Sequence, residues 1–237
     1  MSNNKLLRVI CASMILFAGC TSQNAQNSKK TPAPEDIFMS GTGSGELIEV
    51  FSSVEDRVKS SDAIIYAEVA DFEMVPEKGS GFVHTIETLH IIETLYGDLE
   101  PDSEITVDEL GGYVLIKDFL DAFETEMERS GFRQGWFGKL SDEELGTKYF
   151  AEVPEGYYYP EIGDRAVYCV KKRLSSTEEI YHVAGAWQGE YREMNEGLLV
   201  WPNVNNNSLT DPEKKFAPRT IQYDELKEQI LEAAGKQ

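Results

Sequence analysis

A β-branched and aromatic run, AIIYAEVAD at residues 63–71, predicts the first strand of a folded domain. A longer run follows at residues 82–95 (FVHTIETLHIIETL), and residues 103–110 (SEITVDEL) alternate apolar and polar side chains. Strand character returns at residues 165–172 (RAVYCVKK) and at residues 180–187 (IYHVAGAW). These five segments predict a mainly β domain, because runs of this composition favour a pleated, half-buried surface.

Helical patterns lie at both ends of the strand-rich region and inside it. Apolar residues recur at helical spacing over residues 46–59, and residues 223–234 predict a C-terminal helix. Residues 113–163 interrupt the β pattern, with a helix expected to end near Gly131 and a capping box formed by Ser141 and Glu144.

Three strands, a helical insertion and then two strands is the element order of an OB-type barrel. A further, weaker strand is expected at residues 198–201. We therefore predict an α+β fold that is mainly β. It should be an OB-like five-stranded barrel with an insertion between strands 3 and 4, at about residues 113–163, and terminal helices.

The N-terminus predicts export. Residues 1–8 carry Lys5 and Arg8, and residues 9–18 form an apolar run too short to span a ~30 Å hydrocarbon core as a helix. The end of this run, LFAGC at residues 16–20, resembles the lipobox of bacterial lipoproteins. The resemblance implies that residues 1–19 are a cleaved signal peptide and that Cys20 carries lipid, on the extracytoplasmic face of the cell membrane. An ordinary secretory signal or a buried apolar helix are the alternatives.

The segment after Cys20 predicts a flexible stalk over residues 20–45. Residues 21–36 contain only two apolar residues, both Ala, so they bury too little surface to offset chain entropy. The glycine-rich piece at residues 41–45 is no phosphate loop, because Glu46 stands where the third glycine would be. Residues 46–237 are then expected to form a single globular domain.

The charge of the chain limits its partners. Forty-two acidic and 22 basic side chains give a formal net charge of −20. Such a field repels nucleic acid and anionic lipid headgroups, so we expect no nucleic-acid partner.

Three phrases, SDAIIYAEV at residues 61–69, LYGDL at 95–99 and GDRAVY at 163–168, resemble the core of uncharacterised bacterial lipoproteins. They are also distantly similar to the OB-type domain of netrins and tissue metalloprotease inhibitors. The resemblance covers about residues 61–187 and implies the barrel. It does not imply protease inhibition, because the inhibitors depend on a disulfide-tethered N-terminal cysteine, whereas Cys20 is expected to be acylated here.

Catalytic and metal-binding motifs are not evident. Cys169 lies inside a strand run and is expected to be a small buried thiol. His84 and His90 are six residues apart on one predicted strand, about 20 Å at ~3.3 Å per residue, too far to share a metal. We therefore predict no metal, no cofactor and no catalytic residue, although a carboxylate pair could be hidden among the 42 acids.

The insertion is unusually aromatic. Residues 111–163 hold 11 of the 25 aromatic residues: Tyr113, Phe119, Phe123, Phe132, Trp136, Phe137, Tyr149, Phe150, Tyr157, Tyr158 and Tyr159. A satellite core that packs the insertion onto the barrel is the simpler explanation. The functional hypothesis is a binding face formed by Trp136 and Tyr157–Tyr159, exposed and close together, with Phe119 and Phe123 buried.

Two functions remain open from the sequence. One is a non-enzymatic envelope module that binds a protein, a peptide or a glycan through the insertion. The other is a cell-envelope hydrolase that uses dispersed carboxylates.

Overall fold

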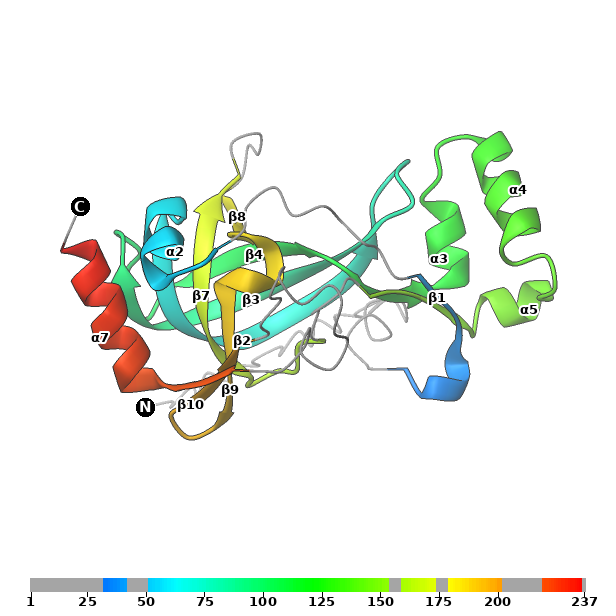
Figure 1. Ribbon diagram of the computed structural model, residues 1–237. Coiled ribbons are helices and arrows are strands. Elements are labelled where there is room, and N and C mark those ends of the chain that lie inside the picture. The colour runs from blue at the N-terminus through cyan, green and yellow to red at the C-terminus, as the bar shows by residue number, and fades with distance from the viewer. Residues whose placement is uncertain (1–31, 42–50, 154–158, 174–178, 202–218, 236–237) are drawn as a thin grey trace, which may run out of the picture.

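A computed structural model of the chain describes residues 32–41, 51–153, 159–173, 179–201 and 219–235 (Figure 1). The stalk residues 20–31 and 42–45 that the sequence predicts, and Cys20 itself, lie outside these ranges. Among the residues described, no helix combines the length and the apolar character needed to cross a membrane.

Five strands close into a barrel, as the sequence predicts. They are β2 (Ala63–Pro76), β3 (Val83–Tyr96), β4 (Glu104–Leu110), β7 (Arg165–Lys172) and β8 (Ile180–Val183). β2 pairs with β3 and β7, β3 with β4, and β8 closes the barrel by pairing in parallel with β4 and antiparallel with β7. The α+β fold with an OB-like barrel is confirmed.

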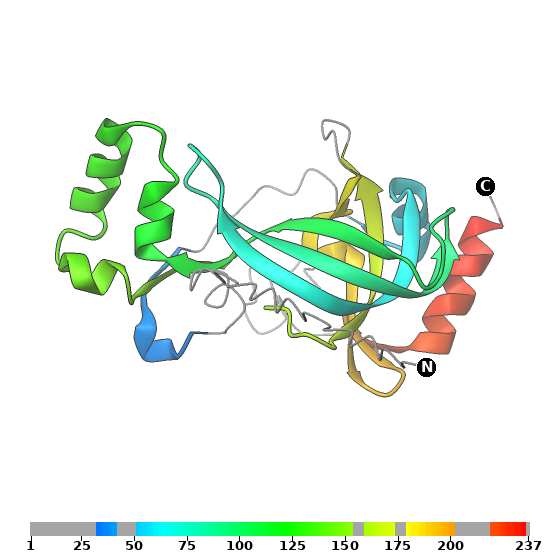
Figure 2. The ribbon, with the colours of Figure 1, turned by 180° about the vertical axis from the view of Figure 1, so that it is seen from behind.

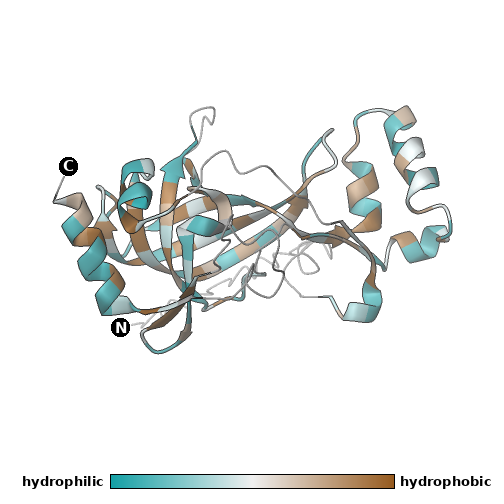
Figure 3. Ribbon diagram, viewed as in Figure 1, coloured by the Kyte–Doolittle hydropathy of each residue, from teal (hydrophilic) through white to brown (hydrophobic). Residues whose placement is uncertain are grey.

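The barrel strands follow from side-chain alternation. On β3, residues at every second position from Val83 to Ile91 are buried, and their neighbours are more exposed. Hydrophobic and hydrophilic residues alternate along the barrel strands in the same way (Figure 3). Gly97 closes β3 with a φ of +88°, and a Cβ there would lie 2.5 Å from the carbonyl oxygen of Asp62, so only glycine fits.

The insertion forms its own small layer. It contains β5 (Gly112–Leu115), α3 (Ile116–Asp121), α4 (Glu126–Gly135), α5 (Asp142–Leu145) and β6 (Tyr149–Glu152). The single helix predicted to end near Gly131 is in fact two helices. The reason is that Thr125 caps a new helix by accepting a hydrogen bond from the Glu128 amide. The capping box of Ser141 and Glu144 is present on α5, as predicted.

Part of the predicted stalk is folded. Pro34–Asp36 form a 3-10 turn (η1), and Ile37–Gly41 form β1, which pairs in parallel with β6 to give a sheet in the order β1-β6-β5. Ile37 and Met39 pack against the main core, so hydrophobic burial outweighs the polar character of the preceding segment.

The first α-helix that the structure describes begins at Val54, whereas the sequence predicts a helix from residue 46. The helix expected over residues 46–59 is described only as α2 (Val54–Ser60), and residues 46–50 lie outside the described ranges. Ser53 forms a capping box with Asp56, which fixes the start of α2.

The C-terminal part extends the barrel sheet and covers one end. β9 (Glu190–Asn195), β10 (Leu198–Trp201) and β11 (Arg219–Gln222) add to β7, and α7 (Tyr223–Ala234) packs beside α2. The strand predicted at residues 180–187 ends at Val183, because Gly185 is left-handed and a 3-10 turn (η2, Ala186–Gly189) follows. Seen from both sides, α2 and α7 lie at one end of the molecule and the insertion with β1 at the other (Figures 1 and 2).

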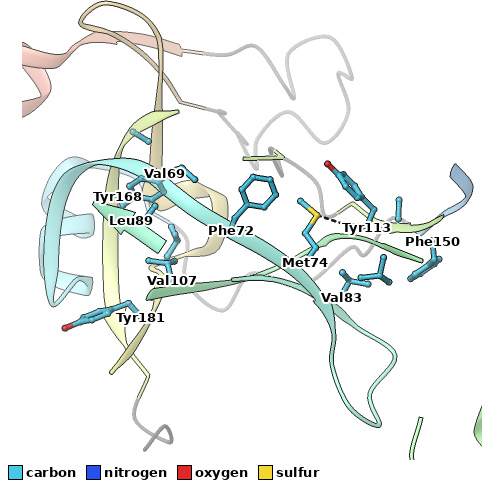
Figure 4. Packing of buried hydrophobic residues seen from close by; sticks show 14 of the residues in the cluster. Val69, Phe72, Met74, Val83, Leu89, Val107, Tyr113, Phe150, Tyr168 and Tyr181 are labelled. Carbon is cyan, nitrogen blue, oxygen red and sulfur yellow. Dashed lines mark hydrogen bonds between the residues drawn. The ribbon is translucent and has the colours of Figure 1, made fainter. Parts of the chain in front are cut away.

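One hydrophobic core runs from the barrel into the insertion. Phe72 and Met74, near the far end of the long strand β2, connect the core residues of the barrel interior with Tyr113 and Phe150 of the insertion (Figure 4). The Tyr113 amide donates to the sulfur of Met74 at 3.3 Å. A second core lies between the other side of the barrel sheet and α2 and α7.

Candidate binding surface

Phe119 is the centre of the aromatic cluster in the insertion. It is fully buried on α3, and five aromatic rings have their centroids within 6.4 Å of its own: Phe123, Phe132, Trp136, Phe137 and Phe150. Phe119 is buried as predicted, and Phe123 is partly buried. Most of these aromatic side chains therefore belong to the part of the main core that extends into the insertion, and they fix α3 and α4 against β6.

Two aromatic side chains remain exposed at the edge of this cluster. Trp136 at the end of α4 is 43% exposed and Phe38 on β1 is 37% exposed. The ring of buried Phe137 lies 6.3 Å from Trp136 and 6.2 Å from Phe38, so the two exposed rings flank it. We call Phe38 and Trp136 the aromatic rim. Sequence reasoning missed Phe38, although the apolar run Ile37–Met39 within a polar segment was a usable signal.

The backbone under the rim is held by polar contacts. The Arg133 guanidinium donates to the carbonyl of Phe137 at 2.5 Å and to the carbonyl of Leu140 at 2.7 Å. The β2–β3 hairpin contacts the end of α3, where the Gly79 amide donates a hydrogen bond to the carbonyl of Ala122 at 3.1 Å. These hydrogen bonds hold the backbone near the aromatic rim in place, and we call this backbone its ordered base.

The predicted binding face is split between two surfaces. Residues directly opposite each other on neighbouring strands share a face. Val114 on β5 lies opposite Phe150, on the side of Trp136, whereas Tyr113 lies opposite Ala151 and faces the other way. Tyr159 packs against Tyr113 with centroids 4.6 Å apart, and its burial raises the pKa of its phenol to about 12. The structure therefore does not bring Trp136 and Tyr159 together on one face, and Tyr157 and Tyr158 lie outside the described residues.

His84 belongs to a network of charged side chains. His84 Nδ1 lies 2.6 Å from Asp108 Oδ1, its Nε2 lies 3.7 Å from Glu77, and Arg173 also contacts Asp108. The hydrogen bond to Asp108 raises the pKa of His84. This network links β3, β4 and the end of β7. Within the described ranges, no group of three or more His, Cys, Asp or Glu side chains is placed to hold a metal ion.

Cys169 is a buried free thiol, as predicted. It lies in the second core on β7, and burial raises its pKa to about 12. A thiol that stays protonated is a poor nucleophile, so its position favours a packing role.

A second polar cluster lies inside the barrel, where the sequence analysis did not locate it. Glu87 on β3 and Glu190 on β9 are 1% and 3% exposed, and Glu190 lies 2.7 Å from the Nε of Arg192. Neither carboxyl oxygen of Glu87 has a hydrogen-bond partner in the described part of the chain. Burial, together with the nearby charge of Glu190, raises the pKa of Glu87 to about 8. Burial also raises the pKa of Glu109 on β4.

The signal for this cluster is present in the sequence but hidden among the many acids. Glu87 occupies a position of β3 whose neighbours on the same face, such as Leu89, are apolar and buried. Side-chain parity alone therefore places this carboxyl in the barrel interior, once the strand and its buried face are known.

The ionisation of Glu87 predicts a pH-dependent stability. An unfolded carboxyl loses its proton near pH 4.5, whereas Glu87 in the folded chain keeps it to about pH 8. The folded state therefore binds more protons in this window, and stability falls as the pH rises through it. Between pH 5.5 and pH 8, Glu87 should lower the free energy of unfolding of the wild-type protein by about 2–3 kcal/mol, at ~1.4 kcal/mol per pKa unit. We expect this part of the decrease to be absent in Glu87→Gln, because glutamine cannot ionise.

Urea denaturation at a series of pH values measures this difference. Glu193→Gln, which removes a carboxyl group outside this cluster at the hydrogen bond from the Tyr66 hydroxyl, is the matched control for the loss of one carboxyl group. An unchanged slope in Glu87→Gln would show that Glu87 ionises normally in the folded protein.

The sequence was compared with models of known protein families and with curated proteins, and neither comparison gives a match.

Proposed function

We propose that this chain is a lipid-anchored module of the cell envelope, held on the extracytoplasmic face of the cell membrane through Cys20. Its activity is binding, and its contact surface is the aromatic rim of Phe38 and Trp136. The partner is a component of the envelope that surrounds the anchored domain.

One observation carries the proposal. Two large aromatic side chains stay about 40% exposed on an ordered base, although the aromatic cluster beside them buries its other members more fully. Exposed aromatic residues on a rigid base are typical anchors of binding surfaces, because they offer much contact area at little entropic loss. The rim lies at the end of the molecule that carries β1, away from α7 (Figure 1).

The hydrolase hypothesis finds less support in the arrangement of carboxylates. Three acids that come together, Glu87, Glu109 and Glu190, lie in the barrel interior, and Glu190 is paired with Arg192. A hydrolase of this type needs two carboxyl groups on either side of a substrate bond. Enclosure in a packed interior favours a role in the barrel core instead.

Hydroxyl-radical footprinting of native membranes tests the proposal. We expect the oxidation of Phe38 and Trp136 to be several-fold slower in native membranes than in the released, detergent-free Cys20→Ala protein, because a bound component shields the rim. Met194 on β9, which is 66% exposed, is the control and should oxidise equally in both. Equal oxidation of Trp136 in both preparations would contradict a binding role for the rim.

A further inference from the structure

The chain enters the folded domain next to the aromatic rim. The first described elements after Cys20 are η1 and β1, and β1 carries Phe38 itself. Twelve residue spacings separate Cys20 from Pro32, the first described residue. At most ~3.6 Å per residue, they reach no further than about 43 Å. An anchor on Cys20 therefore tethers the insertion end of the molecule.

The opposite end is less directly tied to the anchor. α2 and α7 lie at the far end of the barrel in both views (Figures 1 and 2). The position of this attachment point favours the insertion with β1 as the part of the domain that lies nearest to the bilayer. A short tether also gives a high effective concentration of the surface beside it, so that a weak contact is sufficient.

The chemistry of the rim suits a membrane interface. Trp and Phe side chains are enriched where hydrocarbon meets headgroups, and lysine side chains extend from there to water. Lys139 follows Trp136 by three residues and is exposed. Residues 116–148 contain eight acidic and five basic side chains, so the surrounding surface is mildly acidic. Anionic headgroups repel an acidic surface, whereas zwitterionic headgroups, which have no net charge, do not.

We propose that the partner of the aromatic rim is the bilayer itself. With the acyl chains of Cys20 inserted, Phe38 and Trp136 rest in the headgroup region of the same membrane. The insertion then faces the membrane, and the barrel end with α7 faces away from it. This inference rests on the proposed function, since it needs the lipid anchor and uses the same surface.

The test uses the full acylated protein in phosphatidylcholine vesicles that contain a brominated phosphatidylcholine, which quenches tryptophan fluorescence on contact. We expect quenching in the wild-type protein and the loss of most of it in Trp136→Phe, which keeps an aromatic ring at this position. Trp201→Phe is the matched control, because Trp201 is half-buried against Tyr191 on the barrel, and this variant should keep the quenching.

The outcomes separate this inference from the proposed function. If the protein floats with the vesicles but Trp136 is not quenched, the bilayer contact is refuted and the anchor stands. If the rim is protected in native membranes but not quenched in lipid vesicles, its partner is a protein, a peptide or a glycan, and the bilayer contact is again refuted. If the protein carries no lipid and does not float with the vesicles, both proposals fail together.

Discussion

Replacing Phe119 with Ala should lower the free energy of unfolding by about 3–5 kcal/mol, the usual loss when a buried aromatic side chain is emptied from a core. Phe119 is fully buried and contacts the aromatic rings of Phe123, which follows α3, of Phe132 on α4 and of Phe150 on β6. Its removal leaves a cavity at the point where these elements meet. Urea denaturation followed by circular dichroism measures the loss.

Trp136→Ala is the matched variant, because it removes a ring from the rim of the same cluster. It should lower the free energy of unfolding by about 1–3 kcal/mol, less than Phe119→Ala, because Trp136 is already 43% exposed although its ring contacts four others. A larger loss in Trp136→Ala than in Phe119→Ala would mean that Trp136 is a core residue. The rim would then not be available to a partner.

Cys20→Ala should abolish acylation completely and release the protein from the membrane fraction. Acyl chains contribute ~0.8 kcal/mol per buried methylene to membrane binding, and only two of them together hold a protein durably. Labelling of growing cells with a palmitate analogue measures acylation, and fractionation measures location.

Cys169→Ala is the control for this experiment, since Cys169 is a buried free thiol. It should keep the label and the membrane location of the wild-type protein. Continued labelling of Cys20→Ala would contradict the lipobox interpretation. A membrane location without the label would show that another segment holds the protein there.

These variants bear on different parts of the proposal. Cys20→Ala tests the anchor, Phe119→Ala tests the base on which the rim stands, and the vesicle experiment tests the rim itself. The footprint in native membranes links them, because it reports occupation of the rim whatever the chemistry of the partner.

The barrel can be predicted from local patterns in the amino-acid sequence. A local pattern of side chains predicts each barrel strand, as in residues 63–71 and 82–95. The observed β2 and β3 begin within one residue of the starts of these runs. Local patterns are sufficient here because side chains alternate between the interior and the exterior of a barrel strand. The helix cap of α5 could also be predicted from the sequence, because its hydrogen bonds join Ser141 and Glu144, which are only three positions apart.

The positions of the aromatic and acidic side chains depend instead on contacts between segments that are distant in the sequence. β1 forms because β6, more than one hundred residues later, offers it a pairing edge, so a segment with stalk-like composition contributes Phe38 to the rim. The register of β5 against β6 places Tyr113 and Val114 on opposite faces, and this separates Tyr159 from Trp136. Barrel closure encloses Glu87 and raises its pKa. Each of these outcomes depends on contacts between distant segments, which no window of local sequence contains.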